Sequence, residues 1–336
     1  MITRRIGIDL GTANSLVWVQ GEGIVLNEPT VVAISLDDNR VVAVGNEAKQ
    51  MLGRTPGNIQ ALKPMRDGVI ADYQVTEAIL RYFLQKVVGK SFFFKPEVMI
   101  CVPAGCTQVE RRAVLDATLS AGARTAYLID EPLAAAIGAG IAIVAPSGSM
   151  IVDSGGGATE AAVISLGGVV VHRAVRVAGN KIDEAIASWV RKKHSLIIGD
   201  QTAEEVKLKI GSAVSLPKEE MTTLKGRDSI MGLPKIITLT STEVTEAIRP
   251  TLREIIGAIK AVLEETPPEL ASDIIDKGIV LSGGTSLLRG FDKLVTQEIG
   301  VAAHVAEEPM FCVIKGIGTA LENLDLYKRT LLQRPT

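Results

Sequence analysis

The chain has few aromatic residues and few cysteines. Phe, Trp and Tyr together make up 4% of its 336 residues, and the three cysteines are Cys101, Cys106 and Cys312. An odd number of cysteines with no CxxC pair argues against a disulfide framework and fits a reducing cytosol. The length predicts about two domains.

An excess of charge and a long apolar run are also missing. Lys and Arg number 36 against 38 Asp and Glu, so the formal net charge is −2. This balance excludes a strongly basic nucleic-acid binder, and we expect no nucleic-acid partner. The longest apolar run, over 134–146, contains two glycines and is shorter than the about 20 residues of a membrane-spanning helix. With no signal-peptide pattern at the start, we expect a soluble, cytoplasmic chain.

Glycine, by contrast, is abundant, with 32 residues, and it marks an internal repeat. Residues 6–19 have the pattern of a strand, a Gly-containing turn and a second strand, and residues 150–165 repeat it. An aspartate closes the first strand both times, Asp9 and Asp153. A repeat on this scale predicts an α/β protein of two similar lobes, each opening with a β-hairpin.

Apolar periodicity and capping residues predict the other elements. Helices are expected over 75–88, 107–120, 131–139, 181–193, 203–211, 241–265 and 311–321, the last of these ending the series. Strands are expected within 23–36, 40–45, 96–103, 125–129, 221–239 and 279–285. Thr107 and Glu110 have the spacing of a capping box. Since no low-complexity linker separates the lobes, we expect the chain to cross between them more than once.

The two Gly-rich turns predict a phosphate clamp. Glycine lets backbone N–H groups approach phosphate oxygens without an intervening Cβ, and two carboxylates suit a hydrated Mg²⁺. Either turn alone is equally compatible with an ordinary β-turn, but the repeated Asp offset favours function. The sequence has neither a P-loop nor a complete dinucleotide fingerprint, and its three histidines are isolated.

Seven segments together resemble one family. They are DLGTAN (9–14), NEP (27–29), KPMRDGVIAD (63–72), EPLAAA (131–136), DSGGG (153–157), ISLGG (164–168) and TPPEL (266–270). Over nearly the whole chain the sequence resembles the MreB/Mbl family of bacterial actin-like cell-shape proteins, in the superfamily of actin, heat-shock chaperones and sugar kinases. The resemblance implies an α/β, actin-like, two-lobed ATPase with duplicated ribonuclease H-like subdomains around a nucleotide cleft.

The resemblance also implies a division into subdomains and a set of site residues. The subdomains are 1–32 plus 66–144 plus 311–336 (IA), 33–65 (IB), 145–181 plus 241–310 (IIA) and 182–240 (IIB). The phosphate loops are Gly11, Thr12, Ala13 and Asn14, and then Gly155, Gly156 and Gly157. Glu204 and Lys207, three apart on one helical face, contact ribose and adenosine, and Gly283, Gly284 and Thr285 form the adenine-side turn. Asp9 and Asp153 lie near Mg²⁺, and the catalytic residues are Glu131, Asp153 and Thr159.

Three positions depart from the family pattern. Ala158 replaces a threonine whose hydroxyl is expected to position the attacking water, which slows hydrolysis by about 10–100-fold, or ~1.4–2.7 kcal/mol. Asn180 replaces an aspartate near the cleft. Thr285 replaces the third glycine of the adenine-side turn, as in the chaperones.

A run of three phenylalanines predicts membrane contact. Phe92, Phe93 and Phe94 stand between Lys90 and Lys95. Because side chains alternate in an extended segment, some of the three rings are exposed, and an apolar tip rimmed by lysine suits an anionic lipid surface. The alternative is a loop folded onto the core. MreB-like proteins have a hydrophobic membrane loop at this position.

The resemblance implies a membrane-associated cytoskeletal protein at the inner face of the cell membrane. It would bind ATP and Mg²⁺, hydrolyse ATP slowly and form filaments of paired protofilaments. These would organise peptidoglycan synthesis in a rod-shaped cell, with a transmembrane adaptor and cell-wall elongation proteins as partners. The alternatives are a chaperone-type ATPase, for which we expect a peptide-binding domain that we do not find, a small-molecule kinase and a DNA-segregating filament. The choice between an MreB and an Mbl paralogue stays open.

Overall fold

The computed structural model describes residues 4–38, 40–62, 64–66, 69–70, 73–89, 95–327 and 332–335. The chain divides into two compact units. The first comprises Met1–Ser147, Ile164–His172 and Met310–Thr336, and the second Gly148–Val163 and Arg173–Pro309. The chain therefore crosses between the units more than once, as its lack of a linker predicted. The finer division into four subdomains stays a prediction.

The first unit is built on a six-stranded sheet in the order β19-β10-β9-β1-β2-β3. These strands are β1 (Arg5–Leu10), β2 (Asn14–Val19), β3 (Gly23–Pro29), β9 (Glu97–Val102), β10 (Thr125–Asp130) and β19 (Leu332–Pro335). The opening hairpin is confirmed, since β1 pairs antiparallel with β2. On its other side β1 runs parallel to β9.

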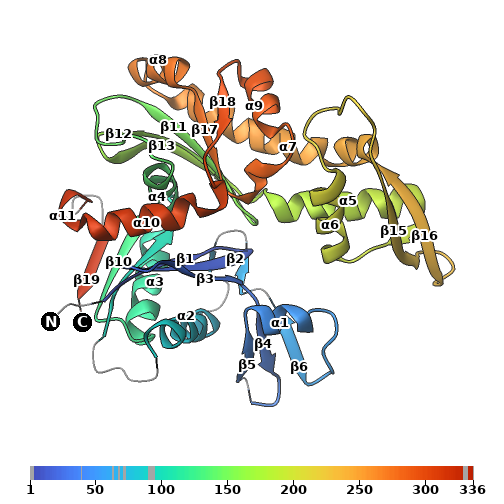
Figure 1. The fold of residues 1–336 in the computed structure, drawn as a ribbon, viewed down its shortest axis with the longest axis horizontal. Coiled ribbons are helices and arrows are strands. Elements are labelled where there is room, and N and C mark those ends of the chain that lie inside the picture. Colours follow the sequence, from blue (N-terminus) through green and yellow to red (C-terminus); the bar gives the residue numbers. More distant parts are fainter. Residues whose placement is uncertain are drawn as a thin grey trace. The chain divides into compact units, whose positions relative to one another are not determined.

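Helices cover both faces of this sheet, and Figure 1 shows α2 and α10 on opposite sides of it. The helices of the unit are α1 (Asn46–Met51), α2 (Tyr73–Val88), α3 (Gln108–Ser120), α4 (Glu131–Gly138), α10 (Cys312–Glu322) and α11 (Leu324–Tyr327). A smaller sheet has the order β5-β4-β6, from β4 (Val32–Ser35), β5 (Val41–Val44) and β6 (Ile59–Leu62). A two-stranded ribbon joins β7 (Met65–Arg66) and β8 (Val69–Ile70).

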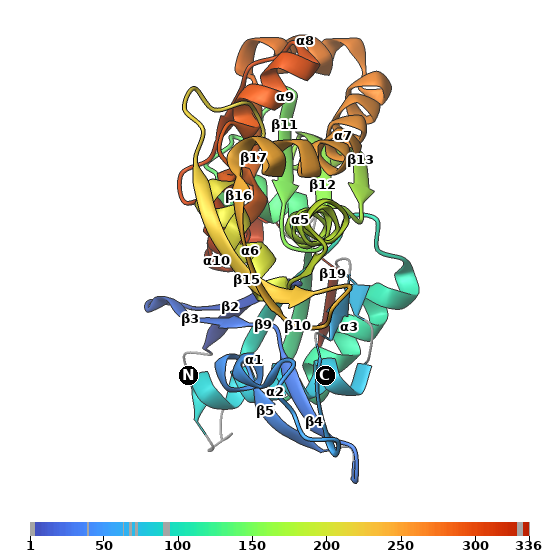
Figure 2. The same ribbon diagram turned by 90° about the vertical axis from the view of Figure 1, so that its right-hand side faces the viewer.

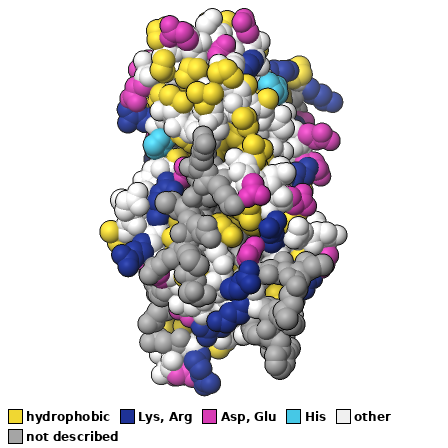
Figure 3. Space-filling view, turned by 90° about the vertical axis from the view of Figure 1, so that its left-hand side faces the viewer, with side chains coloured by type: hydrophobic (Ala, Val, Ile, Leu, Met, Phe, Trp, Pro, Cys, Tyr) yellow, Lys and Arg dark blue, Asp and Glu magenta, His cyan; other side chains and the backbone are white. Residues whose placement is uncertain are grey.

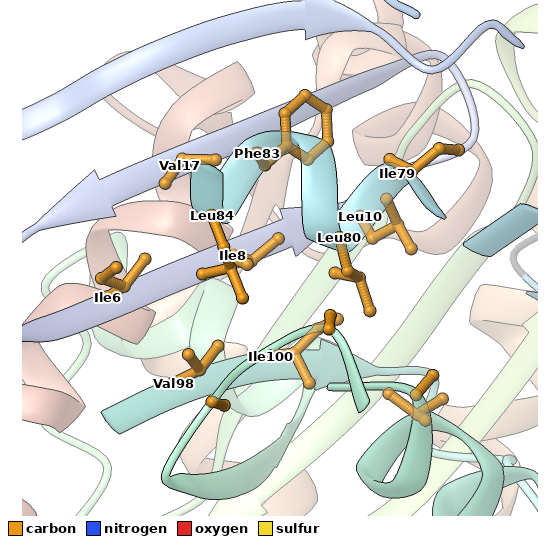
Figure 4. Close-up of a cluster of buried hydrophobic side chains, with 14 of the residues drawn as sticks. Ile6, Ile8, Leu10, Val17, Ile79, Leu80, Phe83, Leu84, Val98 and Ile100 are labelled. Atoms are coloured by element: carbon orange, nitrogen blue, oxygen red, sulfur yellow. The ribbon is translucent and has the colours of Figure 1, made fainter. Parts of the chain in front are cut away.

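The core of this unit is formed by apolar residues that recur at the spacing of a strand in β1 and of a helix in α2 (Figure 4). Alternate residues of β1 point to one face, where Ile6, Ile8 and Leu10 are buried. Helix α2 places apolar residues three and four apart against them, among them Ile79 and Phe83. Gly7 lies on the opposite face, where a Cβ would come within 2.7 Å of a methyl carbon of Ile317 on α10.

Helices α4 and α10 cross at two glycines. A Cβ on Gly138 would overlap the carbonyl oxygen of Cys312, and a Cβ on Gly316 would overlap that of Ala134. Each glycine therefore lets the backbone of the other helix approach it directly. This crossing fixes α4, whose first residue is Glu131, against α10.

The second unit contains a five-stranded sheet in the order β13-β12-β11-β17-β18. Its strands are β11 (Ser149–Ser154), β12 (Thr159–Ser165), β13 (Gly168–Val175), β17 (Ile279–Ser282) and β18 (Ala303–Val305). The segment Ile164–His172, which comprises the end of β12, the turn after it and most of β13, is assigned to the first unit. Strand β17 runs parallel to β11 and to β18.

The helices of the second unit are α5 (Gly179–His194), α6 (Asp200–Ile210), α7 (Ser241–Glu265), α8 (Pro268–Lys277) and α9 (Phe291–Ile299). Two short 3₁₀ turns are η1 (Gly284–Leu287) and η2 (Pro309–Phe311), the second of which spans the unit boundary. A third sheet has the order β14-β15-β16, from β14 (Leu196–Ile197), β15 (Met221–Asp228) and β16 (Pro234–Thr240). The β15–β16 hairpin extends away from the five-stranded sheet (Figures 1 and 2).

Most expected elements are present, and the differences have local reasons. The capping box of Thr107 and Glu110 is confirmed, and α7 has the predicted bounds. The prolines after Thr266 end α7, but they also start α8, because the fixed φ of proline suits the first turn of a helix. The expectation that the helix over 311–321 is the last was wrong, since α11 follows it.

No described helix has the length and apolar character that crossing a membrane requires. On the face shown in Figure 3, basic and acidic side chains are interspersed. This mixture is the surface counterpart of the near-neutral net charge.

Candidate functional site

The turn of the first hairpin requires glycine and is fixed by hydroxyl groups. A Cβ on Gly11 would lie 2.7 Å from the backbone oxygen of Asn14. The Thr30 hydroxyl, just after β3, donates to the carbonyl of Gly11 at 2.6 Å and accepts from Ser15 at 2.8 Å. The predicted first phosphate loop, residues 11–14, is therefore anchored to the end of β3.

Asp9 is buried at the end of β1 and has a cysteine beside it. The Cys101 thiol, on β9, donates to the Asp9 carboxylate, with 3.4 Å between Sγ and Oδ1. Burial raises the pKa of this thiol well above its usual range, and the negative charges of Asp9 and Glu131 raise it further. The thiol thus stays protonated and remains a donor. No local sequence motif marks Cys101 as a neighbour of Asp9, so its place here could not be predicted from the sequence.

The second hairpin turn, between β11 and β12, is held through its carbonyl groups. The carbonyl of Gly155 accepts from the Thr285 hydroxyl at 2.7 Å and from the N–H of Gly179 at 3.2 Å. The carbonyl of Gly156 accepts from the N–H of Asn180 at 2.8 Å. The predicted second phosphate loop is thus bonded to the first residues of α5 and to η1.

These bonds orient the N–H groups of the loop. In a trans peptide the C=O and the N–H point in opposite directions, and the described chain has no cis peptide bond. Because the carbonyls of Gly155 and Gly156 face α5, the N–H groups of Gly156 and Gly157 face away from it. Among the described residues, neither N–H has a protein acceptor. Successive free N–H groups in a turn form an anion-binding concavity.

Asp153 lies at the end of β11, directly before this loop. Its carboxylate is buried and accepts from the Ser282 hydroxyl at 2.6 Å. Burial raises the pKa of Asp153 to about 6, although the Ser282 hydrogen bond acts in the opposite direction. A cation beside such a buried carboxylate would stabilise its charged form. Among the described residues, no group of three or more His, Cys, Asp or Glu side chains could hold a metal ion by itself.

Thr159 follows the loop on β12, and its side chain is fully buried. Its hydroxyl donates to the carbonyl of Val177 at 2.7 Å and accepts from Ser154 at 2.7 Å. In the first unit the Ser15 hydroxyl, on β2, bonds to the Thr30 hydroxyl just after β3. In both units a hydroxyl on the second strand of the opening hairpin therefore bonds to a residue that follows the third strand.

Lys207 on α6 is bound on two sides. Its ammonium lies 2.9 Å from the Asp183 carboxylate and donates to the carbonyl of Gly179 at 3.2 Å. Both charged side chains are mostly buried. Glu204, its predicted companion, is exposed. Lys207 therefore joins α6 to the first turn of α5, and so to the second loop.

The predicted adenine-side turn follows β17. Gly283 has a φ of 82°, and a Cβ there would overlap the carbonyl of Ser154. The N–H of Gly283 donates to the carbonyl of Pro309 at 2.9 Å, and the buried Ser286 hydroxyl donates to Ser282 at 2.5 Å. Glycine at 283 thus lets the turn pack directly on the end of β11.

The predicted residues fall into two sets, one in each unit. The first set is Asp9, Gly11, Thr12, Ala13, Asn14 and Glu131. The second is Asp153, Gly155, Gly156, Gly157, Thr159, Glu204, Lys207, Gly283, Gly284 and Thr285. In the second unit one hydrogen-bonded group joins the glycine loop, Lys207 and Thr285. Phe92, Phe93 and Phe94 lie outside the described residues.

A comparison with models of known protein families identifies the family to which this chain belongs. The model of the MreB/Mbl protein family matches residues 3–329. The chain belongs to the MreB/Mbl family. This confirms the resemblance seen in the sequence motifs.

Individual MreB and Mbl proteins agree with this membership. The chain is 51% identical over 332 residues to the cell shape-determining protein MreB of Escherichia coli, covering 97% of this chain and 96% of that protein. It is 49% identical over 332 residues to the cell shape-determining protein Mbl of Bacillus cereus, covering 98% of this chain and all of the relative. MreB and Mbl relatives are thus about equally similar.

Solved structures confirm the actin-like α/β fold. MreB5 of Spiroplasma citri bound to AMPPNP matches with a TM-score of 0.92 and 36% identity, covering 98% of this chain and 99% of that one. The MamK double helical filament matches with a TM-score of 0.80 at 23% identity, covering 96% and 99%, and shows the same fold.

Proposed function

We propose that this chain is an ATP-binding, filament-forming actin-like protein that determines rod cell shape by organising peptidoglycan synthesis. The observation that carries the proposal is the second glycine loop, whose N–H groups at Gly156 and Gly157 have no acceptor among the described residues and face away from α5. Two further findings support it. The related MreB and Mbl proteins are cell shape-determining proteins, and MreB5 of Spiroplasma citri was solved with both AMPPNP and ADP.

In this proposal the two glycine loops bind the phosphates of ATP. Gly155, Gly156 and Gly157 offer backbone N–H groups from the second unit, and residues 11–14 do so from the first. Gly283, Gly284 and Thr285 form the adenine side of the site. Glu204 contacts the ribose, because its exposed carboxylate is available to hydroxyl groups. Lys207 contacts the adenosine with the part of its side chain that stays accessible beside the ion pair with Asp183.

Mg²⁺ would be held through water by Asp9 and Asp153, and bound there it neutralises charge on the phosphates. The carboxylate of Asp153 supports this assignment, because burial raises its pKa to about 6 and a cation would stabilise its charged form. Asp9 is held in one orientation by the Cys101 thiol. The two side chains therefore act by orienting the water shell of the ion.

Hydrolysis is slow in this proposal. Glu131, the first residue of α4, holds the attacking water, and the positive end of the helix dipole favours its charged form. Asp153 and Thr159 complete the catalytic group: Asp153 would hold the metal through water, and Thr159 holds the loop through its hydrogen bonds to Ser154 and Val177. Ala158 offers no hydroxyl to the water, so the chain works as a slow ATPase.

The assembly we propose is a filament of paired protofilaments at the inner face of the cell membrane. The MamK double helical filament, which shares the fold, supports head-to-tail assembly. Phe92, Phe93 and Phe94 anchor the filament to lipid, and a transmembrane adaptor and cell-wall elongation proteins are its partners. ATP closes the lobes and favours the filament conformation.

Electron microscopy of the full chain on a lipid monolayer tests the proposal. The purified protein is applied with Mg-ATP to anionic lipid, with a neutral monolayer as the matched control. We expect paired filaments lying on the anionic lipid and few on the neutral one. Monomers alone, across several protein and salt concentrations, would contradict the polymer, and assays for peptide binding and small-molecule phosphorylation would then test the chaperone and kinase alternatives.

A further inference from the structure

We infer that Thr285 is a positioning residue for the second glycine loop and that its hydroxyl couples the base side of the nucleotide site to the phosphate side. The inference rests on the proposed nucleotide binding. The Thr285 side chain is buried at the start of η1, and its hydroxyl donates to the carbonyl of Gly155 at 2.7 Å. That carbonyl belongs to the peptide unit that also carries the N–H of Gly156.

This peptide unit has two restraints, and Thr285 supplies the shorter one. The other is the N–H of Gly179, 3.2 Å from the same carbonyl. Glycine backbones rotate freely, so a glycine loop keeps one orientation only while its polar groups are held. With both restraints, the carbonyl of Gly155 faces α5 and η1, and the N–H of Gly156 faces the opposite way. Without the hydroxyl, one longer bond remains to hold the peptide.

The neighbouring atoms leave the threonine little freedom. A Cβ built on Gly179 would come within 3.2 Å of the Thr285 hydroxyl and 3.4 Å of the Lys207 ammonium. Lys207 in turn holds the carbonyl of Gly179 at 3.2 Å. Thr285, Gly179 and Lys207 thus form a packed group beside the loop, and Thr285 joins this group to the turn that follows β17.

The coupling follows from the position of this turn. Thr285 lies in η1, two residues after Gly283, which packs on the end of β11. A nucleotide base that displaces η1 also moves the hydroxyl that holds Gly155. Base binding and phosphate binding are then linked through one hydrogen bond. The sequence has Thr285 where the family pattern has a third glycine. In this inference the consequence of that replacement is the hydrogen bond to Gly155.

Four proteins test the inference: wild type, Thr285→Val, Thr285→Ser and Thr245→Val. Valine keeps the shape of threonine and removes the hydroxyl, whereas serine retains it. Thr245 is the matched control, because it is a similarly buried threonine of the second unit that donates to the backbone carbonyl of Ser212 at 3.0 Å. Two quantities are measured, the dissociation rate of a fluorescent ADP analogue with Mg²⁺ and the hydrogen exchange of residues 154–160 without nucleotide.

We expect Thr285→Val to release the ADP analogue about 5–30-fold faster than wild type, the effect of losing one buried hydrogen bond. Exchange of residues 154–160 rises in the same variant. Thr285→Ser restores both values to within about 3-fold of wild type, and Thr245→Val changes neither, although it lowers the melting temperature.

The inference is overturned if Thr285→Val behaves as Thr245→Val does, or if serine fails to restore the loop. A wild-type chain that binds no nucleotide would instead contradict the proposed function. The exchange measurement would then still show whether Thr285 holds the loop.

Discussion

At Ala158 the backbone and the side chain have separate effects: the backbone closes a turn, and the side chain lacks a hydroxyl. It follows three glycines, and its carbonyl accepts the N–H of Gly155 at 3.0 Å, a bond that closes the turn. Only the backbone of residue 158 makes this bond, so a different side chain leaves the turn intact. We therefore expect the missing hydroxyl to affect hydrolysis and to leave the backbone of the predicted phosphate loop unchanged.

The variant Ala158→Thr is expected to hydrolyse ATP about 10–100-fold faster than wild type, because a hydroxyl returns beside the attacking water. Phosphate release under single-turnover conditions measures this rate. The affinity for a non-hydrolysable ATP analogue serves as the control and should stay the same. An unchanged rate would mean that the hydroxyl is dispensable at this position.

At the scale of elements, the crossing of α4 and α10 depends on absent side chains. Gly138 contacts the backbone of α10, and Gly316 contacts that of α4. By contrast, Gly257 lies within α7 with no atom within 4 Å of its would-be Cβ. A side chain at Gly138 or Gly316 would therefore clash with the neighbouring helix, whereas one at Gly257 would meet open space.

The pair Gly138→Ala and Gly257→Ala tests this contrast. Gly138→Ala should destabilise the protein by roughly 3 kcal/mol or more, because the added Cβ forces two helix backbones apart. Gly257→Ala should stabilise it by about 0.5–1 kcal/mol, since alanine loses less backbone entropy on folding. Urea unfolding at one temperature compares them. If both variants changed the free energy of unfolding by the same amount, the crossing would tolerate the methyl group.

The N-terminus of α7 combines a capping box with a hydrogen bond to His194. Thr240 and Glu243 cap each other, and the Glu243 carboxylate lies 2.7 Å from Nε2 of His194. Burial opposes the charge on Glu243, but hydrogen bonds from His194 and from the N–H of Thr240 outweigh it and lower the pKa. Because the folded-state pKa is lowered, the stability from this carboxylate is present above its ordinary value of 4.5 and is lost as the pH falls through the lower value.

Glu243→Gln should therefore lower the melting temperature at pH 7, and lower it less as the pH falls below 4.5 through the lowered pKa, where wild type loses the same charge. At pH 7 the cost should be about 1 kcal/mol, as for the loss of a cap. Glu246→Gln, at an exposed position of the same helix, is the control and should change stability little at either pH. A constant difference across the pH range would contradict the role of the charge.

At the scale of the whole molecule, the filament that we propose would turn weak lipid contacts into stable binding. Each phenylalanine that enters a membrane interface contributes on the order of 1–2 kcal/mol. Three in one monomer bind marginally, but a filament presents many copies to the same surface, and their contributions combine. Membrane attachment should therefore depend on both the phenylalanines and assembly.

Replacing Phe92, Phe93 and Phe94 by serine should abolish sedimentation with anionic liposomes and leave filaments in solution intact. The matched control replaces Ile230, Met231 and Leu233, three exposed apolar residues at the β15–β16 turn, and should retain lipid binding. Liposome binding that survives the first triple variant would exclude these phenylalanines as the anchor.

Elements that depend on neighbours in the chain could be predicted from the sequence. The opening strands, the capping box at Thr107 and the bounds of α7 follow from periods and caps within a few residues. Short elements such as α1, β14 and β18 were missed, because two to six residues carry too little of any period. The family could also be predicted, since its motifs are contiguous.

The two glycine loops, the aspartate before each of them and the family that shares them follow from contiguous residues of the chain. What holds these groups in place follows from contacts between residues that are distant in the chain. The Cys101 thiol meets Asp9 across 92 positions, and the Thr285 hydroxyl meets Gly155 across 130. The physical reason is that loops and caps arise from local backbone preferences, whereas a hydrogen bond between distant residues exists only once the sheets and helices have brought the two atoms together.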